Sequence, residues 1–191
     1  SMFHECDWSE FYGDVKEPIP LNAPKPRGRP VVLRMFVDSS HADCKETRRS
    51  RSGWLIYMQY GLIDWHSKKQ GSVESSVFGA EFVAMKNGVD TLRGIRYKLR
   101  MMGVEVPDPT FIFGDNMSVI TNTQRPESTL KKKSNSICYH AIRESVAMGE
   151  SLTAHIRTAN NLSDFMTKVL YGIKKKRLVK HVLADLYDDH N

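Results

Sequence analysis

A long amphipathic segment in the middle of the chain most constrains what this sequence can fold into. Between residues 77 and 99, apolar side chains recur every three or four positions, which is typical of a helix that packs one face against a core. Glu81 lies near the middle of this apolar face. Because a carboxylate buried in a core costs free energy unless a cation compensates it, the pattern predicts either a metal ion or a buried arginine beside Glu81.

Short apolar segments on both sides of this helix indicate strands, and other periodic segments indicate further helices. The expected strands are 31–38, 53–60, 62–67, 110–115 and 151–158. The expected helices are 75–102, a short helix after Asn116, 136–150, a helix that begins at Asn160 or Asn161 and includes Asp164, and 172–186. This order predicts an α/β fold with a five-stranded mixed sheet and helices on both faces. The first three strands are expected to form an antiparallel meander, and the fourth and fifth to run parallel to the first.

Four acidic residues follow these elements in order: Asp38, Glu81, Asp115 and Asp164. Asp38 and Asp115 each end an apolar strand, and the ends of parallel neighbours meet at one sheet edge, so we expect these two side by side with Glu81 facing them. Taken singly, a turn explains Asp38, a helix cap explains Asp115, and the helix dipole explains Asp164, three or four residues into its expected helix. Converging carboxylates, in contrast, are typical of a site for divalent cations, and their oxygen ligands favour Mg²⁺.

The charge of the chain indicates a polyanionic partner. It has 28 Lys and Arg against 22 Asp and Glu, for a net charge of +6. The positive residues cluster at 48–51, 68–69, 131–133 and 174–177, which fits binding to a phosphate backbone, with solvated surface as the alternative. Combined with the carboxylates, these clusters predict phosphodiester cleavage with two metal ions about 3.5–4 Å apart.

The distribution of prolines divides the chain. Five of the eight prolines lie within residues 1–30, which we expect to be an extended tether that lies on the domain or leads into it. Trp8, Phe11 and Tyr12 are candidates to dock part of this tether onto the body. Residues 31–170 are expected to form the main domain, and 171–191 a basic C-terminal helix. Neither a membrane span nor a signal peptide is expected, because the sequence has neither a long apolar run nor a basic-then-apolar start.

Several other residues are weaker candidates for a functional site. Asp43 is a second acid near the first strand, but Asp38 ends the apolar run directly. His41 and Cys44 lie three residues apart, which alone is weak support for zinc. The three cysteines are scattered and indicate reduced thiols in the cytosol. His140 lies on an amphipathic helix, where a structural role is the simpler interpretation.

Five motifs around these acids occur in a fixed order along residues 31–170. They are VDSSHADCKETRRSRSG (37–53), IDWHSKKQGSVESSVFGAEFVAM (63–85), FGDNMSVI (113–120), LKKKSNSICYHAIRE (130–144) and NLSDFMTKVL (161–170). Together they resemble the ribonuclease H domain of copia-type LTR retrotransposon polyproteins. The Pro-rich start resembles the connection from an upstream reverse transcriptase.

The resemblance implies a ribonuclease H-like fold and metal-dependent cleavage of the RNA strand of RNA–DNA hybrids during reverse transcription. By position, the catalytic and metal-binding residues are Asp38, Glu81, Asp115 and Asp164, which would bind two Mg²⁺ ions that Mn²⁺ can replace. The implied contacts to the hybrid are Ser39, Ser76 and Asn116 in the minor groove, and Lys68, Lys69, Lys131, Lys132 and Lys133 on phosphates.

The resemblance also implies partners and one departure from the family. The partners are the hybrid and the reverse transcriptase domain of the same polyprotein, in a cytoplasmic particle or the nucleus, with the isolated domain monomeric and away from membranes. Many ribonucleases H carry a histidine in a loop just before the fourth acid, whereas residues 158–161 contain none. His155 falls in the expected fifth strand, where a packed histidine is the simpler interpretation. We therefore expect slower turnover than in enzymes with that histidine.

Two other functions are compatible with the same fold. A catalytically silent domain would bind nucleic acid or a protein without cleaving, but it would have no reason to keep Glu81 on an apolar face. An integrase-like DNA strand transferase usually relies on a late glutamate, and this chain has Asp164 there.

Overall fold

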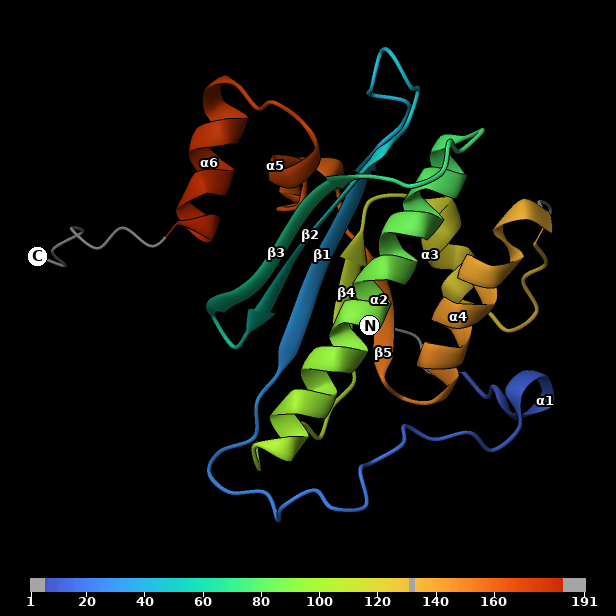
Figure 1. Cartoon of the computed structure of the whole chain (residues 1–191), viewed down its shortest axis with the longest axis vertical. Helices are drawn as coiled ribbons and strands as arrows, with labels where there is room; N and C mark the ends of the chain where they lie inside the picture. Colours follow the sequence, from blue (N-terminus) through green and yellow to red (C-terminus); the bar gives the residue numbers. More distant parts are fainter. Residues whose placement is uncertain (1–5, 131–132, 184–191) are drawn as a thin grey trace, which may run out of the picture.

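A mixed five-stranded sheet forms the centre of the fold, with the strand order β3-β2-β1-β4-β5 (Figure 1). The computed structural model describes residues 6–130 and 133–183. β2 pairs antiparallel with β1 and β3, whereas β4 pairs parallel with β1 and β5. This confirms the predicted fold class, including the antiparallel meander and the two parallel strands. The strands are β1 (Leu33–Ser40), β2 (Arg51–Met58), β3 (Gly61–Lys69), β4 (Thr110–Gly114) and β5 (Ser151–His155).

Helices cover both faces of this sheet, as predicted (Figure 1). The long α2 lies across one face together with α3 and α4, and the shorter α5 and α6 lie on the other face. None of the helices in the described ranges is long and apolar enough to cross a membrane. The helices are α1 (Ser9–Tyr12), α2 (Val77–Met101), α3 (Met117–Gln124), α4 (Ser136–Ala147), α5 (Asp164–Thr167) and α6 (Gly172–Val182), with 3₁₀ turns at Lys133–Asn135 and Thr158–Asn160.

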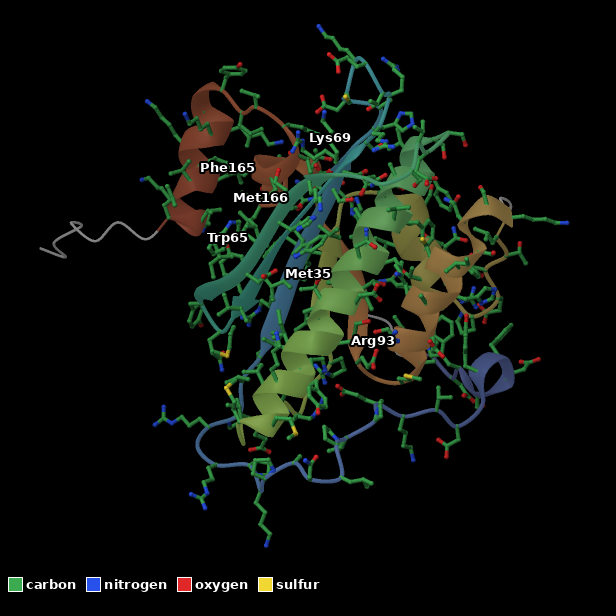
Figure 2. The ribbon with its side chains drawn as sticks, viewed as in Figure 1. Met35, Trp65, Lys69, Arg93, Phe165 and Met166 are labelled. Carbon is green, nitrogen blue, oxygen red and sulfur yellow. The ribbon has the colours of Figure 1, made fainter. Side chains whose placement is uncertain are left out.

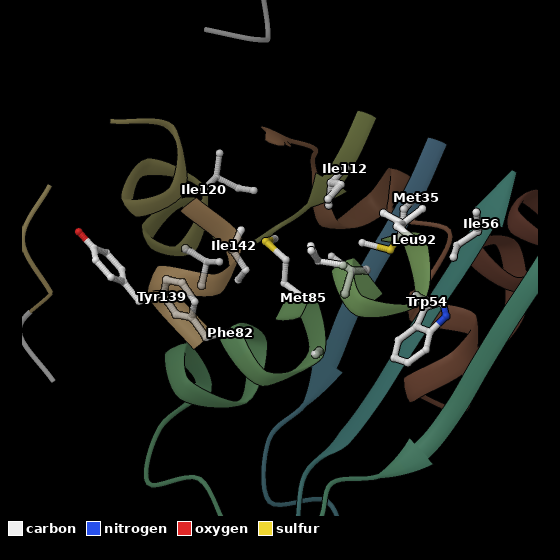
Figure 3. Packing of buried hydrophobic residues seen from close by; sticks show 14 residues of the cluster. Met35, Trp54, Ile56, Phe82, Met85, Leu92, Ile112, Ile120, Tyr139 and Ile142 are labelled. Carbon is white, nitrogen blue, oxygen red and sulfur yellow. The ribbon is translucent and has the colours of Figure 1, made fainter. Parts of the chain in front are cut away.

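The main core lies between α2, α4 and the sheet (Figure 3). Phe82 and Met85 on α2 are buried against side chains of the sheet and of α4, and each such burial contributes roughly 1.5–3 kcal/mol. Most of the predicted apolar face of α2 is therefore the face that packs. Val77 is the exception and is 51% exposed, because the helix is buried only from Gly79 onward.

On the opposite face, α5 lies directly against β2. A Cβ at Gly53 would lie 2.6 Å from the Cβ of Met166 and 2.7 Å from the Cγ2 of Thr167, so only glycine allows this approach. Figure 2 shows Phe165 and Met166 on this side of the sheet. Farther along the same face, α6 packs through the buried Leu178. The loop around the fourth acid is thereby fixed to the centre of the sheet.

The N-terminal segment lies on the body of the domain. Trp8 is buried, and the guanidinium of Arg143 on α4 lies 4.9 Å from its ring centroid. Glu17 forms salt bridges with Arg96, at 2.7 Å, and with Arg100, both on α2. These contacts agree with the expectation that aromatic residues dock this segment. The division of the chain at residues 30 and 170 stays a prediction.

The predicted end of the first strand was wrong. β1 continues past Asp38 to Ser40, because β2 goes on pairing with it: Ser39 lies opposite Ser52, and Ser40 lies opposite Arg51. Asp38 therefore projects from within a paired strand. This position fixes its backbone more firmly than the turn that its sequence neighbours suggested.

Two predicted helices also differ from the structure. Asp164 is the first residue of the short α5 rather than lying three or four residues into a helix, because a separate 3₁₀ turn precedes it. α6 ends at Val182, before the expected residue 186, since Leu183 adopts an extended backbone conformation. The part of the expected helix beyond Leu183 lies outside the described residues.

Candidate active site

Three of the four predicted acids meet where β1, β4 and α2 converge. Asp38 lies on β1, Asp115 directly follows β4, and Glu81 lies near the start of α2. Because β1 and β4 are parallel neighbours, their carboxyl-terminal ends share one edge of the sheet, and the packed face of α2 directs Glu81 toward it. One carboxylate oxygen of each acid lies within 4.8 Å of the other two. The convergence predicted from the topology is present.

Glu81 is buried in this cluster without a basic partner. Its side chain is 6% exposed, and Oε1 accepts a hydrogen bond from the N–H of Ser39 at 3.3 Å. Within the described ranges no lysine, arginine or histidine forms a salt bridge with it. Burial raises the pKa of Glu81 well above its usual value, and the charges of Asp38 and Asp115 raise it further. The buried arginine considered as an alternative is therefore not what the structure shows.

The surroundings of Asp38 also disfavour its ionised form. Burial raises its pKa to about 6, and the charges of Asp164 and Asp115 add to the shift, whereas a hydrogen bond from Thr167 and the charge of Lys168 oppose it. Converging carboxylates, with the pKa values of Asp38 and Glu81 raised, fit a divalent cation, which would neutralise their mutual repulsion. The residues present therefore fit the divalent metal that the resemblance implies.

Asp164 adjoins this cluster but is differently compensated. It is completely buried, and its two carboxylate oxygens accept from Lys168, at 2.7 Å, and from Lys174 of α6. Lys168 also lies 3.2 Å from Oδ2 of Asp38 and so links the two acids. Although burial opposes ionisation of Asp164, the hydrogen bonds and charges of the two lysines outweigh it and lower the pKa.

The loop that carries Asp164 is tied to β1 by residues that sequence reasoning did not single out. The side-chain amide of Asn161 donates to the carbonyl of Val37 at 3.0 Å, and its Oδ1 accepts from the N–H and the hydroxyl of Ser163. The hydroxyl of Thr167 donates to Oδ2 of Asp38. Asn161 and Thr167 lie in the NLSDFMTKVL motif, and the spacing of four between Asp164 and Lys168 was a signal for a helical ion pair.

Two predicted substrate contacts, Ser39 and Asn116, directly follow acids of the cluster in the chain, and the third, Ser76, precedes the helix that carries Glu81. Ser76 and Asn116 are the N-caps of α2 and α3, where their side chains accept from backbone N–H groups. Ser39 is buried beside Glu81, and its hydroxyl has no partner among the described residues. A capping role accounts for the first two, so their contact with nucleic acid stays a prediction.

The predicted phosphate-binding lysines lie on two separate parts of the surface. Lys68 and Lys69 are exposed at the end of β3, where Lys69 lies 3.2 Å from the sulfur of Cys44. Lys133 is exposed in the turn before α4, whereas Lys131 and Lys132 lie outside the described residues. Their role in binding stays a prediction.

The weaker candidates are not members of the acidic cluster. Asp43 is exposed and lies 4.0 Å from Arg51. His140 pairs with the hydroxyl of Tyr12 at 2.9 Å, which supports a structural role. His155 lies in β5, as expected, and is half-buried, but β5 ends at this residue and does not continue to the expected residue 158. In the described part of the chain, the only group of three or more metal-ligating residues found is the acidic one, so nothing there supports zinc at His41.

Comparison with known sequences gives Pol polyproteins of plant transposons among the relatives. No protein-family model matches the chain. It is 29% identical over 144 residues, 75% of its length, to the retrovirus-related Pol polyprotein from transposon RE1 of Arabidopsis thaliana. It is 27% identical over 143 residues to the corresponding polyprotein from transposon TNT 1-94 of Nicotiana tabacum. The chain spans only about a tenth of the length of these relatives, 10% and 11%.

Comparison with solved structures gives the fold. The RNase H1 of the archaeon Halobacterium salinarum NRC-1 superposes with a TM-score of 0.55 and 13% identity, over 71% of this chain and 93% of that one. LC11-RNase H1, solved in complex with an RNA/DNA hybrid, gives a TM-score of 0.56 and 15% identity over the same shares. The predicted resemblance is confirmed: over three quarters of its length the chain is homologous to Pol polyproteins of copia-type retrotransposons, and its fold is that of ribonuclease H.

Proposed function

We propose that this chain is a ribonuclease H that hydrolyses the RNA strand of RNA–DNA hybrids during reverse transcription of a retrotransposon. The observation that carries the proposal is the convergence of the buried Asp38 and Glu81 with the half-buried Asp115. Within the described residues, no basic side chain forms a salt bridge with Glu81. Strongly perturbed carboxylates in a shared site are typical of functional sites. The ribonuclease H fold and the retrotransposon relatives support the same reaction.

The acids would hold divalent metal, with Mg²⁺ as the expected ion and Mn²⁺ as a substitute. Asp38, Glu81 and Asp115 offer the shared oxygens, and Asp164 is the predicted fourth ligand in a two-ion mechanism. When bound, such ions supply activation of the attacking water and stabilisation of the leaving 3′ oxygen. The N–H of Ser39 holds Glu81 in place. The pairing of β1 with β2, which continues through Ser40, would hold the backbone of Asp38 in place.

Substrate binding would use the basic surface around this cluster. Lys68, Lys69 and Lys133 are exposed and suited to phosphates of the hybrid. Ser39, Ser76 and Asn116 border the acids, where 2′-hydroxyl groups of the RNA strand would identify it as RNA. Lys131 and Lys132 belong to the same proposal by sequence alone.

The domain would work as one part of a larger protein. Its relatives are Pol polyproteins of which it spans about a tenth, so we propose an upstream reverse transcriptase domain as its partner and the cytoplasmic retrotransposon particle as its location. In that arrangement the reverse transcriptase would deliver the hybrid. The isolated domain is expected to be a monomer with weaker binding.

The test is cleavage of an end-labelled RNA–DNA hybrid with Mg²⁺ or Mn²⁺. Wild type should cut the RNA strand, and Asp115→Asn should not. Asp43→Asn, which changes an exposed acid outside the cluster, should cut as wild type does. A DNA duplex of the same sequence should remain intact. If wild type binds the hybrid but cuts it with neither metal, the domain is a catalytically silent binding module and the proposal is wrong.

A further inference from the structure

Lys168 occupies a position between two of the four acids. Its ammonium group lies 2.7 Å from Oδ1 of Asp164 and 3.2 Å from Oδ2 of Asp38. We propose that Lys168 is a positioning residue that acts as a built-in cation at Asp38 and Asp164 and excludes a second divalent ion until substrate arrives. This inference rests on the proposed metal-dependent function and adds a residue that controls how many ions the site holds.

The hydrogen bonds divide the four acids into two groups. Oδ2 of Asp38 already accepts from Thr167 and Lys168, and both oxygens of Asp164 are engaged by Lys168 and Lys174. One oxygen each of Asp38, Glu81 and Asp115 remains close enough to share an ion. The structure thus offers one site made of three carboxylates, and a second site that lysine side chains fill.

The balance of charge leads to the same conclusion. When all four acids are ionised, as metal binding requires, they carry four negative charges, and Lys168 and Lys174 offset two of them. A single divalent ion neutralises the rest. A second ion would then enter a site without net negative charge, which low dielectric surroundings make unfavourable. The phosphate of a bound nucleic acid restores negative charge and so favours the second ion or the departure of a lysine.

The position of Lys168 in the fold allows it to leave. It follows the last residue of α5, and its side chain is 41% exposed, in contrast to the completely buried Asp164 that it contacts. Its flexible stem can turn toward solvent without moving α5. Asp164, in contrast, stays fixed because the neighbouring Asn161 anchors the loop to the carbonyl of Val37.

A purely structural role for Lys168 predicts different behaviour. If the lysine only fastens α5 to β1, its removal should loosen Asp38 and weaken the binding of every ion. If it competes with an ion, its removal should leave the first ion in place and strengthen the second. The number and the affinity of bound ions therefore separate the two roles, whereas thermal stability alone does not.

The experiment is titration of the chain with Mn²⁺ in the absence of nucleic acid, followed by electron paramagnetic resonance of free Mn²⁺ and by calorimetry. The variants are Lys168→Met, Lys168→Gln and Lys168→Arg. Lys98→Met is the matched control, because Lys98 is an exposed lysine on α2 and its replacement changes the net charge equally. Wild type should bind one ion, with the second at least about tenfold weaker.

Lys168→Met and Lys168→Gln should bind the second ion at least about tenfold more tightly than wild type, while Lys168→Arg and Lys98→Met should not. The glutamine variant keeps hydrogen-bonding capacity, so it serves if the methionine variant does not fold. If Lys168→Met and Lys168→Gln bind the second ion with unchanged affinity, or bind the first ion more weakly, the inference is wrong and the proposed function still stands. A wild type that binds no Mn²⁺, with or without hybrid, overturns both.

Discussion

Two glutamates with little solvent exposure, one near each end of α2, have opposite electrostatic surroundings. At the C-terminal end, Glu17 of the N-terminal segment meets Arg96 and Arg100, and although burial opposes its ionisation, hydrogen bonds from the two arginines lower its pKa. At the N-terminal end, Glu81 meets two further acids, and burial together with their charges raises its pKa. A glutamate that docks against one end of α2 is thus compensated by basic side chains, whereas the glutamate that α2 itself carries at the other end is not.

The contrast separates stability from function. A buried acid with arginine partners is satisfied by the protein itself and holds two segments together, although such a pair adds little net stability over apolar packing. A buried acid beside other acids lowers the stability of the metal-free fold, and a ligand of opposite charge relieves that cost. The end of α2 that carries Glu81 is therefore where function is expected, and the end that carries Arg96 is where structure is maintained.

The largest effect should come from Glu81→Gln. The amide keeps the shape of the side chain but removes the charge that would hold a divalent ion, so cleavage of an RNA–DNA hybrid should fall at least about a thousandfold, or roughly 4 kcal/mol in activation free energy. The metal-free variant should be no less stable than wild type, because a buried like charge has been removed. Single-turnover cleavage and thermal melting measure these two quantities. A variant that cuts normally would contradict the site.

Glu17→Gln should have the opposite profile. It leaves the nearly buried guanidinium of Arg96 without its counter-charge, which should lower the free energy of unfolding by about 3 kcal/mol. Cleavage per folded molecule should not change, because the pair lies at the far end of α2 from the acids. Urea unfolding and cleavage well below the melting temperature test this. A loss of activity without a loss of stability would show that the N-terminal segment also affects the site.

The elements that bring three acids together could be predicted from the sequence. Periodicity placed Glu81 on the packed face of a helix, and the rules for parallel strands placed Asp38 beside Asp115. These inferences succeed because apolar patterns and chain topology are largely local properties of the sequence. The predicted parallel pairing of β4 with β1 and β5 is also confirmed.

The compensation of Asp164 could not be predicted in this way. Its partner Lys174 comes from α6, and the anchor of its loop is a backbone carbonyl of β1, at Val37. Such contacts depend on how α5 approaches β2, which Gly53 permits and which no periodicity encodes. Likewise, Glu17 in a Pro-rich segment carries no local signal that it meets Arg96.

The pH dependence of stability sharpens the comparison for Asp38. Burial raises its pKa from 3.8 to about 6, so the metal-free fold favours the protonated form. The stability that this provides is fully present below about pH 3.8 and is lost as the pH rises through about 6. Between pH 4 and pH 6 the loss is about 2 kcal/mol for this group.

Asp38→Asn removes this dependence, so its stability relative to wild type should increase over the same range of pH. Glu17 has a lowered pKa and acts in the opposite direction, with stability lost as the pH falls, but it lies at the other end of α2, is common to both proteins and cancels in the difference. Urea unfolding of both proteins at each pH, in the presence of a chelator, measures the difference in their free energies of unfolding. Saturating Mg²⁺ should reduce the difference at pH 7, and a difference independent of pH would show that Asp38 is not electrostatically strained.

The smallest effect should come from Asp43→Asn. This substitution tests whether an acid is functional merely because it lies near the first strand in the sequence. Asp43 lies in the same motif as Asp38, but it is exposed. Its carboxylate lies 4.0 Å from the guanidinium of Arg51 on β2. An exposed pair of this kind contributes at most about 1 kcal/mol. Stability and the Mg²⁺ dependence of cleavage should therefore both stay close to those of wild type. If the variant instead lost metal dependence, burial without a counter-charge would not be the property that distinguishes the functional acids, and Asp43 would replace Asp38 as the ligand from this part of the chain.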